Sequence, residues 1–435
     1  MGARVRHWAF GLLLVPGIAV AQAERPGVTL SEAIRLAEQV QPSLVQARTG
    51  VYNAEARLRV TSGAFLPNLN VSSSGSTNFS EGPSRVDQAS GQVITGNTTS
   101  SSVGANISSS IDLFTGFRRG ADRRAANASL DAAEASLTNA SFQLKLQTTN
   151  LFYDALAAEQ LLGVREASLR RAEEQLTVAI NRLQAGAATR SDSLRSLVTV
   201  GQARLQLITA ETQLASAEAN LGRIIGREGR VRAVPDPALY DVQVSFDTVG
   251  LRQEALSNAP TVQTSVANAE AARASLAASK SAYWPSLNLS GSQSFNASGR
   301  NDYEVFQGRS MSLGLSWPIF NRFNREANIR TSLSSLDVAE ANMSESRRQV
   351  LASLTVRLAE LYAAATRIEI AQTSIEAATE DLRVQQERYR LGLATIVDLL
   401  QAQEALNQAE VDAVNARFDY LRARAQIETL IGRSL

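Results

Sequence analysis

Apolar residues recur at helical spacing over most of this chain, and the longest such stretch, from Phe117 to Gly186, contains no proline. The pattern predicts a helix over Arg118–Ala185, which at 1.5 Å per residue is about 100 Å long. A second helix of similar length is predicted over Asn324–Leu391. The shorter predicted helices are Leu30–Val40, Ser43–Gly63, Ser191–Ile225, Val249–Ala259 and Ile396–Ile431.

The helix predicted over Ile396–Ile431 has two apolar seams. At 100° per residue their centres lie about 150° apart, so each seam needs its own neighbouring helix. Neighbours on two opposite sides are expected in the wall of a cylinder, whereas one seam alone favours a structural coiled coil. The first seam consists of Leu399, Ala402, Leu406, Ala409, Ala413, Ala416, Tyr420, Ala423, Ile427 and Leu430, and the second of Val411, Val414, Phe418, Leu421 and Ala425.

Four stretches change to the two-residue alternation of β-strands: 66–78, 103–114, 284–296 and 309–320. A four-stranded sheet has unpaired edges, which lipid does not tolerate, so a membrane-spanning sheet needs strands from several chains. Three chains would supply about 12 strands. The apolar positions expected on a lipid face are Val71, Phe79, Val103, Ile107, Ile111, Leu113, Leu287, Leu289, Phe295, Met311, Leu313 and Leu315.

Prolines and aromatic residues stand where these strands meet the helices. Pro67, Pro285, Trp317 and Pro318 are the candidate residues of this junction. An aromatic residue there belongs either to a girdle at the membrane interface or to simple packing between strand and helix. The prolines fit a junction under both interpretations.

The second half of the chain repeats the first. The long helical stretches match at an offset of about 206 residues, and the first strand of each half and the prolines Pro42 and Pro260 match at about 218. The chain therefore divides into a first repeat (24–225), a linker (226–247) and a second repeat (248–435).

Each repeat has a tight turn between its long helices, at residues 185–191 and 391–395. Gly186 and Gly392 supply the left-handed residue that ends a helix, and Thr395 can cap the helix that follows. Asp192 and Asp398 lie just after the two turns. A carboxylate at such a position either stabilises the helix dipole or, in a ring of several chains, contributes to an acidic constriction.

The N-terminus has the pattern of a secretory signal peptide. Arg4 and Arg6 precede an apolar run at 9–20, and residues 21–23 form a small-x-small cleavage site. We expect residues 1–23 to be removed and the mature chain to begin at Glu24.

Composition excludes several classes of chemistry. The chain has no Cys, and its one His, His7, lies in the signal peptide. A Cys nucleophile, a His general base, a Ser-His-Asp triad and a Cys/His zinc site are excluded, so neither an enzyme nor a cofactor is expected. The net charge of +1 gives no basic field for nucleic acid. No apolar run of about 18 residues follows the signal peptide, so no transmembrane helix is expected.

The arrangement of the whole expected mature chain resembles the outer membrane efflux protein family, the TolC-like channels. Its most specific motif is Arg388-Tyr389-x-x-Gly392-x-x-Thr395-x-x-Asp398-x-Leu400-x-Ala402-Gln403-x-x-Leu406, with a degenerate copy at Arg182–Leu194. The strand-to-helix passages Leu113-Phe114-x-Gly116 and Trp317-Pro318-Ile319-Phe320 add to it.

The resemblance implies a mostly α fold and a homotrimer. Each chain would give four strands to a 12-stranded β-barrel in outer-membrane lipid, and its long helices would form an α-helical barrel across the periplasm. Members of the family are exit ducts for efflux or type I secretion. They work with a periplasmic adaptor and an inner-membrane pump of the RND or ABC type, and have no chemistry of their own.

The resemblance also assigns roles to the turns. Asp192 and Asp398 would line the periplasmic aperture. Polar links between tips hold the resting tube of family members closed, which makes Tyr389, Arg390 and Asp192 the candidate latch, with a link from Tyr389 to Asp192. The candidate adaptor-docking residues are Ala185, Gly186, Ala187, Leu391, Gly392 and Leu393; the alternative is that each Gly serves only its turn.

A different class of protein, a trimeric coiled-coil surface fibre or adhesin without transport, is the alternative function. It predicts one seam per helix and no duplicated strand pairs. The two seams and the four strands disagree with both expectations.

Overall fold

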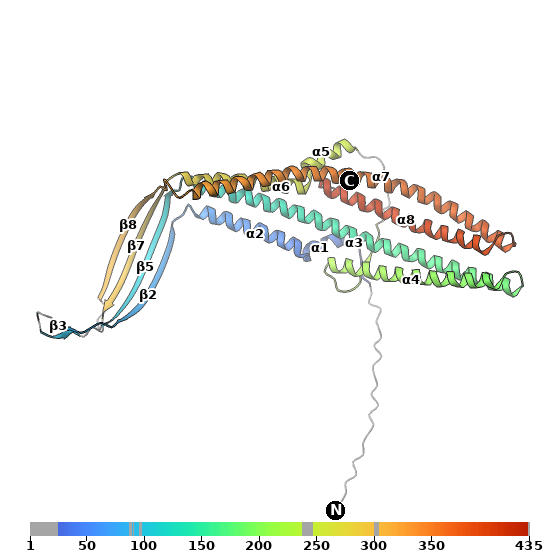
Figure 1. Cartoon of the computed structure of the whole chain (residues 1–435), viewed down its shortest axis with the longest axis horizontal. Coiled ribbons are helices and arrows are strands. Elements are labelled where there is room, and N and C mark those ends of the chain that lie inside the picture. Colours follow the sequence, from blue (N-terminus) through green and yellow to red (C-terminus); the bar gives the residue numbers. More distant parts are fainter. Residues whose placement is uncertain are drawn as a thin grey trace, which may run out of the picture.

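The structure, a computed structural model, describes residues 25–86, 89, 91–94, 98–236, 247–299 and 304–433 (Figure 1). The expected signal peptide lies outside the described residues, and so do residues 237–246 of the expected linker. Figure 1 shows an elongated molecule with a β-sheet at one end and helical hairpin tips at the other.

Four long helices form the two hairpins. They are α3 (Arg118–Gln184), α4 (Arg190–Ile224), α7 (Asn324–Arg390) and α8 (Ile396–Ile431). The predicted boundaries of all four hold to within one residue. α3 and α7 both contain 67 residues, and both ends of α7 lie 206 positions after those of α3, as the duplication predicts.

Four short helices precede the first long strand of each repeat, two before β2 (Asn68–Ser80) and two before β7 (Ser286–Gly299). They are α1 (Leu30–Val40), α2 (Pro42–Gly63), α5 (Thr248–Asn258) and α6 (Pro260–Ser279). α2 and α4 both pack on α3 (Figure 1), and α6 and α8 both pack on α7. The second helix starts at Pro42 rather than at Ser43, because the first helical position tolerates a residue without an N–H.

Both predicted seams of α8 are buried. Along the first seam Leu399, Leu406 and Tyr420 are buried, and along the second Phe418 and Leu421 are. α8 packs against α7 and α3, so the two seams have two different neighbours. The largest cluster of buried residues lies midway along the bundle, where the Phe418 ring centroid is 6.5 Å from that of Tyr153 on α3.

The sheet consists of β2 (Asn68–Ser80), β5 (Thr98–Phe114), β7 (Ser286–Gly299) and β8 (Glu304–Ser316). Their order is β2-β5-β7-β8, every pair is antiparallel, and β2 and β8 are the edges. The prediction of the fourth strand at 309–320 is wrong at both ends. β8 begins five residues earlier and stops before Trp317, since Pro318 has no N–H for the ladder. β5 also begins five residues before the predicted 103.

The two strand pairs of the sheet have the same register. Asn68 lies opposite Ser110 in the first pair, and Ser286 lies opposite Ser316 in the second. The two β2 and β7 positions are 218 residues apart and the two β5 and β8 positions are 206 apart, which are the offsets found in the sequence. The duplication therefore extends to single residue pairs.

The sheet has one apolar and one polar face. Register places Val71 beside Ile107, and Leu289 beside Ile111 and Leu313, on one face. The opposite face is almost entirely Ser, Asn and Gly, with hydroxyl pairs such as Ser290 and Ser312, whose oxygens are 2.7 Å apart. All but one of the predicted lipid-face residues share the apolar face. The exception is Leu113, at the irregularity between Asp112 and Phe114.

Five small elements were not predicted. β1 (Gly27–Val28) pairs in parallel with β6 (Arg232–Ala233), and η2 (Lys280–Tyr283) is a 3-10 turn before β7. A two-residue pair, β3 (Arg85–Val86) with β4 (Val93–Ile94), connects β2 to β5. Beside the β1–β6 pair, the buried Glu218 carboxylate accepts from Arg230 at 2.6 Å and from Arg25 at 3.4 Å.

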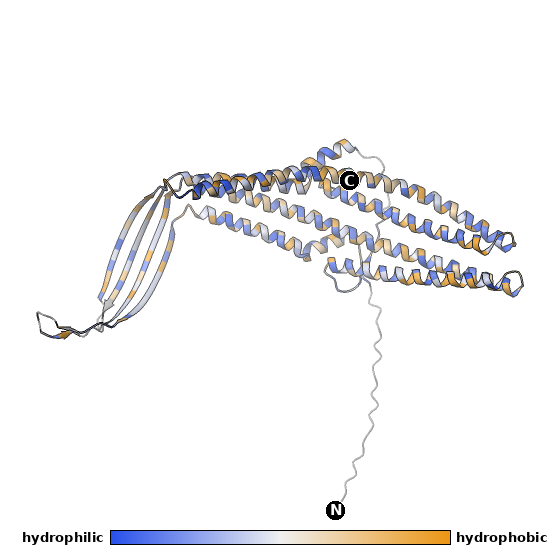
Figure 2. Cartoon of the chain, viewed as in Figure 1, coloured by the Kyte–Doolittle hydropathy of each residue, from blue (hydrophilic) through white to orange (hydrophobic). Residues whose placement is uncertain are grey.

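Within the described part of the chain, none of the helices is both long and apolar enough to cross a membrane. Figure 2 agrees, since hydrophobic and hydrophilic residues alternate along the helices without a continuous apolar run.

Candidate functional site at the hairpin tips

The turns at the two tips have the same hydrogen bonds. In the first, the N–H of Ala187 donates to Arg182 O at 2.8 Å and that of Gly186 to Leu183 O at 3.0 Å. The second turn repeats both bonds from Leu393 and Gly392. This is the Schellman arrangement, which needs a left-handed residue, and both glycines have φ above +70°.

Capping boxes begin the helices that follow. The Thr395 N–H donates to Asp398 Oδ2 at 3.0 Å, and the Asp398 N–H donates to Thr395 Oγ1 at 3.3 Å. Thr189 and Asp192 form the same pair of bonds in the first tip. The predicted Thr395 cap is confirmed. Hydrogen bonds from the Thr395 hydroxyl and N–H lower the pKa of Asp398, which keeps this exposed carboxyl ionised.

A cation–π contact joins the two hairpins. The Arg182 guanidinium on α3 lies 4.4 Å from the ring centroid of Tyr389 on α7, and its Nη2 donates to Ala187 O at 3.2 Å. Tyr389 is only 4% exposed although it sits one turn from the tip. Arg182 therefore closes its own turn and covers the aromatic ring of the other hairpin.

The candidate latch residues are close together but not all bonded. Burial raises the pKa of Tyr389, the Arg182 cation opposes this rise, and the Asp192 charge adds to it. The Tyr389 hydroxyl is buried and has no hydrogen-bond partner among the described residues. Asp192 instead accepts from Thr189, and Arg390 forms an exposed ion pair with Glu387 at 3.1 Å. The link from Tyr389 to Asp192 thus remains a prediction.

The tips are apolar at their ends. Leu391 and Leu393 are each 66% exposed, and Ala185, Gly186, Ala187 and Gly392 are exposed as well. A surface of this kind at the end of a long bundle is suited to contact another protein.

At the opposite end of the helices, two equivalent arginines hold the sheet to the bundle. Arg119 donates to Leu113 O at 3.2 Å and lies 4.9 Å from the Phe65 ring centroid. Arg325, at the equivalent place in the second repeat, donates to Pro318 O at 3.4 Å and lies 4.1 Å from the Tyr283 ring centroid.

The predicted junction residues lie in this region. Pro67 and Pro285 directly precede β2 and β7, and Trp317 donates to Tyr283 O at 3.2 Å. Sequence reasoning missed Arg119, Arg182 and Arg325 as site residues. The available signal was their place in the repeat, since Arg119 and Arg325 correspond to each other and Arg182 corresponds to Arg388.

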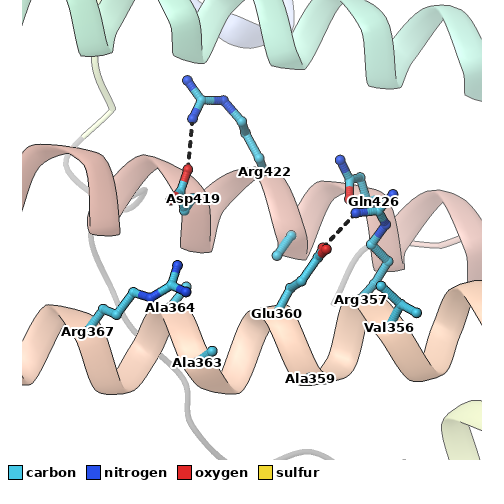
Figure 3. Close-up of a pocket in the computed structure, with 11 residues that line it drawn as sticks. Val356, Arg357, Ala359, Glu360, Ala363, Ala364, Arg367, Asp419, Arg422 and Gln426 are labelled. Carbon is cyan, nitrogen blue, oxygen red and sulfur yellow. Dashed lines mark hydrogen bonds and ion pairs between the residues drawn. The ribbon is translucent and has the colours of Figure 1, made fainter.

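A groove between α7 and α8, midway along the bundle, is lined by charges that are mostly paired (Figure 3). Arg357 and Glu360 are 2.6 Å apart, and Arg422 reaches from α8 to Asp154 on α3 at 2.7 Å. Among the described residues there is no cluster of acidic side chains that could hold a metal ion. The pair of Arg357 and Glu360 thus lies within α7, whereas the pair of Arg422 and Asp154 joins α8 to α3.

Comparison with known proteins finds a matching protein family. The sequence model of the family described as outer membrane efflux protein matches residues 33–227 and 251–433. The chain is 24% identical over 419 residues to the pyoverdine export outer membrane protein OpmQ of Pseudomonas putida, covering 93% of this chain and 85% of that protein. It is 24% identical over 425 residues to the outer membrane efflux protein BepC of Brucella suis, covering 97% and 89%. Its fold is similar to that of the CmeC outer membrane channel of Campylobacter jejuni, with a TM-score of 0.79, 17% identity, and coverage of 93% of this chain and 85% of that one.

Proposed function

Because this chain belongs to the outer membrane efflux protein family, we propose that three copies close into one conduit, with 12 strands in the outer membrane and the helices in the periplasm. The chain is an outer-membrane efflux or secretion channel, like its relatives. The trimer, the closed barrel and the roles of the tips are the parts that need a test.

The open edges of the sheet carry the proposal. β2 and β8 have no partner strand within the described chain, yet the sheet has a mainly apolar face and a Ser/Asn face. Lipid does not tolerate an open edge, so β8 of one copy must pair with β2 of the next. Three such junctions give 12 strands with the apolar face outside.

The duplication predicts the register between copies. β5 and β7 join the two repeats within one chain, and Asn106 lies opposite Ser294 there. Applying the offsets of 206 and 218 to this pair places Ser312 of one copy opposite Ser76 of the next. Both side chains belong to the polar face, so the pairing preserves the two faces of the sheet.

Disulfide crosslinking tests this closure, and the chain has no Cys that would give a background. Ser312→Cys with Ser76→Cys should give covalent trimers on oxidation of outer-membrane fractions. Ser312→Cys with Ser72→Cys, two rows away from that register, is the matched control and should crosslink poorly. Trimers that are absent from the outer membrane, or that crosslink equally in both variants, would contradict the proposed closure.

The apolar tips would dock a periplasmic adaptor that connects the channel to an inner-membrane pump. Leu391 and Leu393 are the most exposed apolar side chains of the second turn. Leu393→Glu should abolish crosslinking to the copurifying adaptor. Val86→Glu, a change at a 61% exposed valine at the far end of the molecule, should not. Identifying the pump that copurifies decides between the RND and ABC types.

Asp192 and Asp398 would form an acidic ring of six carboxylates in the trimer. The hydrogen bonds from Thr395 lower the pKa of Asp398, so its capping role leaves that charge in place. Asp192→Asn with Asp398→Asn should lower the preference for cations over anions in planar bilayers. An unchanged reversal potential in a salt gradient would exclude the acidic ring.

A further inference from the structure

One charged side chain stands on the apolar face of the four-stranded sheet. Among the described strand residues of that face, Arg309 on β8 is the one charge. Its Nε donates to Gln293 Oε1 on β7 at 2.8 Å, and Gln307 is the next residue of β8 on the same face. The two acidic strand residues of the sheet, Asp112 and Glu304, belong to the opposite face. The Arg309 cation therefore has no carboxylate beside it.

The first repeat shows what this position holds without the charge. By the repeat offsets, Arg309 and Gln293 correspond to Val103 and Gly75, which are also opposite each other. At this level of the sheet the first repeat thus has an uncharged pair, and the second has a cation that is hydrogen-bonded to an amide. The fold itself does not need the arginine.

The height of Arg309 explains how the membrane tolerates it. Trp317, 58% exposed, marks the end of the sheet next to the helices, and Arg309 lies eight residues further along the strand. At about 3.3 Å per residue and a tilt of about 40°, this is roughly 20 Å of an apolar band about 25 Å tall. A long side chain there extends its charge into the headgroups, where the cost is small.

The surroundings of Arg309 favour a phosphate. The predicted register between copies places Arg309 opposite Phe79 of the next copy, a residue that is 63% exposed and uncharged. The nearest carboxylate of that copy, Glu81, follows the end of β2 and would lie opposite Gln307. The Nη atoms of Arg309 make no hydrogen bond within the described chain, and the buried Gln293 Nε2 also has no partner there. A guanidinium fork with an amide donor beside it matches the geometry of phosphate oxygens.

We propose that Arg309 and Gln293 bind a phosphate group of an outer-leaflet lipid, one lipid per chain, at the seam between two copies. The site rests on the proposed trimer, because only insertion as a closed barrel turns this face to lipid. Around the ring, the site that binds a phosphate, supplied by each second repeat, would alternate with the matching apolar place in each first repeat.

The experiment uses the purified full-length trimer in dodecyl maltoside, which has no phosphate. Bisphosphorylated lipid A is added, and bound lipid is counted by native mass spectrometry while thermal dissociation of the trimer is followed. Arg309→Val with Gln293→Gly copies the first repeat into the second. Val103→Arg with Gly75→Gln copies the second into the first. Glu304→Gln, a charge change on the other face of β8, is the control.

We expect three tightly bound lipids on the wild-type trimer and on the control, at least tenfold weaker binding to the Arg309→Val, Gln293→Gly variant, and six bound lipids on the converse variant. Lipid should raise the dissociation temperature of the wild type and leave that of the Arg309→Val, Gln293→Gly variant unchanged. Arg309→Lys should bind with intermediate affinity, since it keeps the charge without the fork.

Three results would overturn the site. Unchanged lipid binding in the Arg309→Val, Gln293→Gly variant would remove Arg309 from it. Equal stabilisation by inorganic phosphate would make it a site for a soluble anion. If the trimer of the Arg309→Val, Gln293→Gly variant dissociated without added lipid, Arg309 would be assigned to the contact between copies. Failure of the wild type to form conducting outer-membrane trimers would instead reject the proposed function, and is measured separately.

Discussion

The Arg182 guanidinium lies 4.4 Å from the centre of the Tyr389 ring, and this contact connects the two hairpins of one chain one turn from their tips. Tyr389 is buried, and Arg182 also closes its own turn through Ala187 O. The contact therefore couples the shape of one turn to the position of the other helix pair.

Removing the cation should loosen the tips. We expect Arg182→Ala to cost about 0.5–1 kcal/mol for the cation–π contact and to widen the distance between the hairpins. Spin labels on Ala187→Cys and Leu393→Cys would measure that distance, and conductance in planar bilayers should rise. Arg388→Ala changes the equivalent arginine of the second hairpin, which makes no such contact in the described chain. An equal effect of both substitutions would assign the change to net charge.

Tyr389 should make the stability of the tips sensitive to alkaline pH. Its folded pKa is raised by burial above the ordinary value near 10, so the folded state favours the neutral phenol. This contribution to stability is complete below pH 10 and is lost as pH rises through the folded pKa. The wild type should therefore lose stability in thermal melts above pH 10.

Tyr389→Phe separates this group from the other tyrosines. Burial also raises the pKa of Tyr153, to about 12, but this group is the same in the wild type and the variant and cancels in their comparison. The phenylalanine variant should lose less stability between pH 10 and 11 than the wild type. It should be as stable at pH 7, because the removed hydroxyl has no partner in the described chain. Identical pH profiles would exclude Tyr389 as the sensor.

The capping boxes should stabilise the first turn of each helix that follows a tip. Thr395→Ala removes the hydroxyl that accepts from Asp398 N–H, and we expect a loss of about 1 kcal/mol, seen as faster hydrogen exchange in the first turn of α8. Thr395→Ser, which keeps the oxygen, is the matched control. The hydrogen bonds that lower the pKa of Asp398 stabilise the tip above its unfolded pKa near 3.8, and this is lost as pH falls through the lower folded value.

The buried Glu218 should hold the β1–β6 pair to the bundle. Glu218→Gln breaks the ion pairs with Arg230 and Arg25, and because both arginines are partly exposed to solvent we expect a cost of about 1–3 kcal/mol. The readout is urea unfolding with limited proteolysis near residue 25. Glu211→Gln, on the exposed side of α4, should change neither. Unaltered proteolysis in the Glu218 variant would show that the pair is not needed to hold this segment.

Helical periodicity was enough to predict the four long helices of the bundle, because long amphipathic helices have both their spacing and their stops in the local sequence. The two seams of α8 identified two neighbours before any contact was known. Strand ends were less predictable. The start of β8 depends on its pairing with β7, and Trp317 lies outside because the following proline cannot donate.

At the tips, too, local features could be predicted from the sequence, whereas contacts between distant residues could not. The turns, the caps and the exposed leucines follow from Gly392, Thr395 and the residues next to them, all within one turn of helix. The contact between Arg182 and Tyr389 joins residues that are 207 positions apart, so no local pattern contains it. The β1–β6 pair is equally non-local, and its strands are too short to show an alternation.

The matched registers of the two strand pairs have a consequence for how the molecule diverged. A ring of six identical single repeats would place the same side chains in every tip and at every height of the sheet. Fusion of two repeats into one chain breaks that symmetry, so the position that holds Leu183 in one hairpin can hold Tyr389 in the other. The Arg182 cation then contacts an aromatic ring, whereas six identical repeats would present the same residue, a leucine or a tyrosine, at every tip.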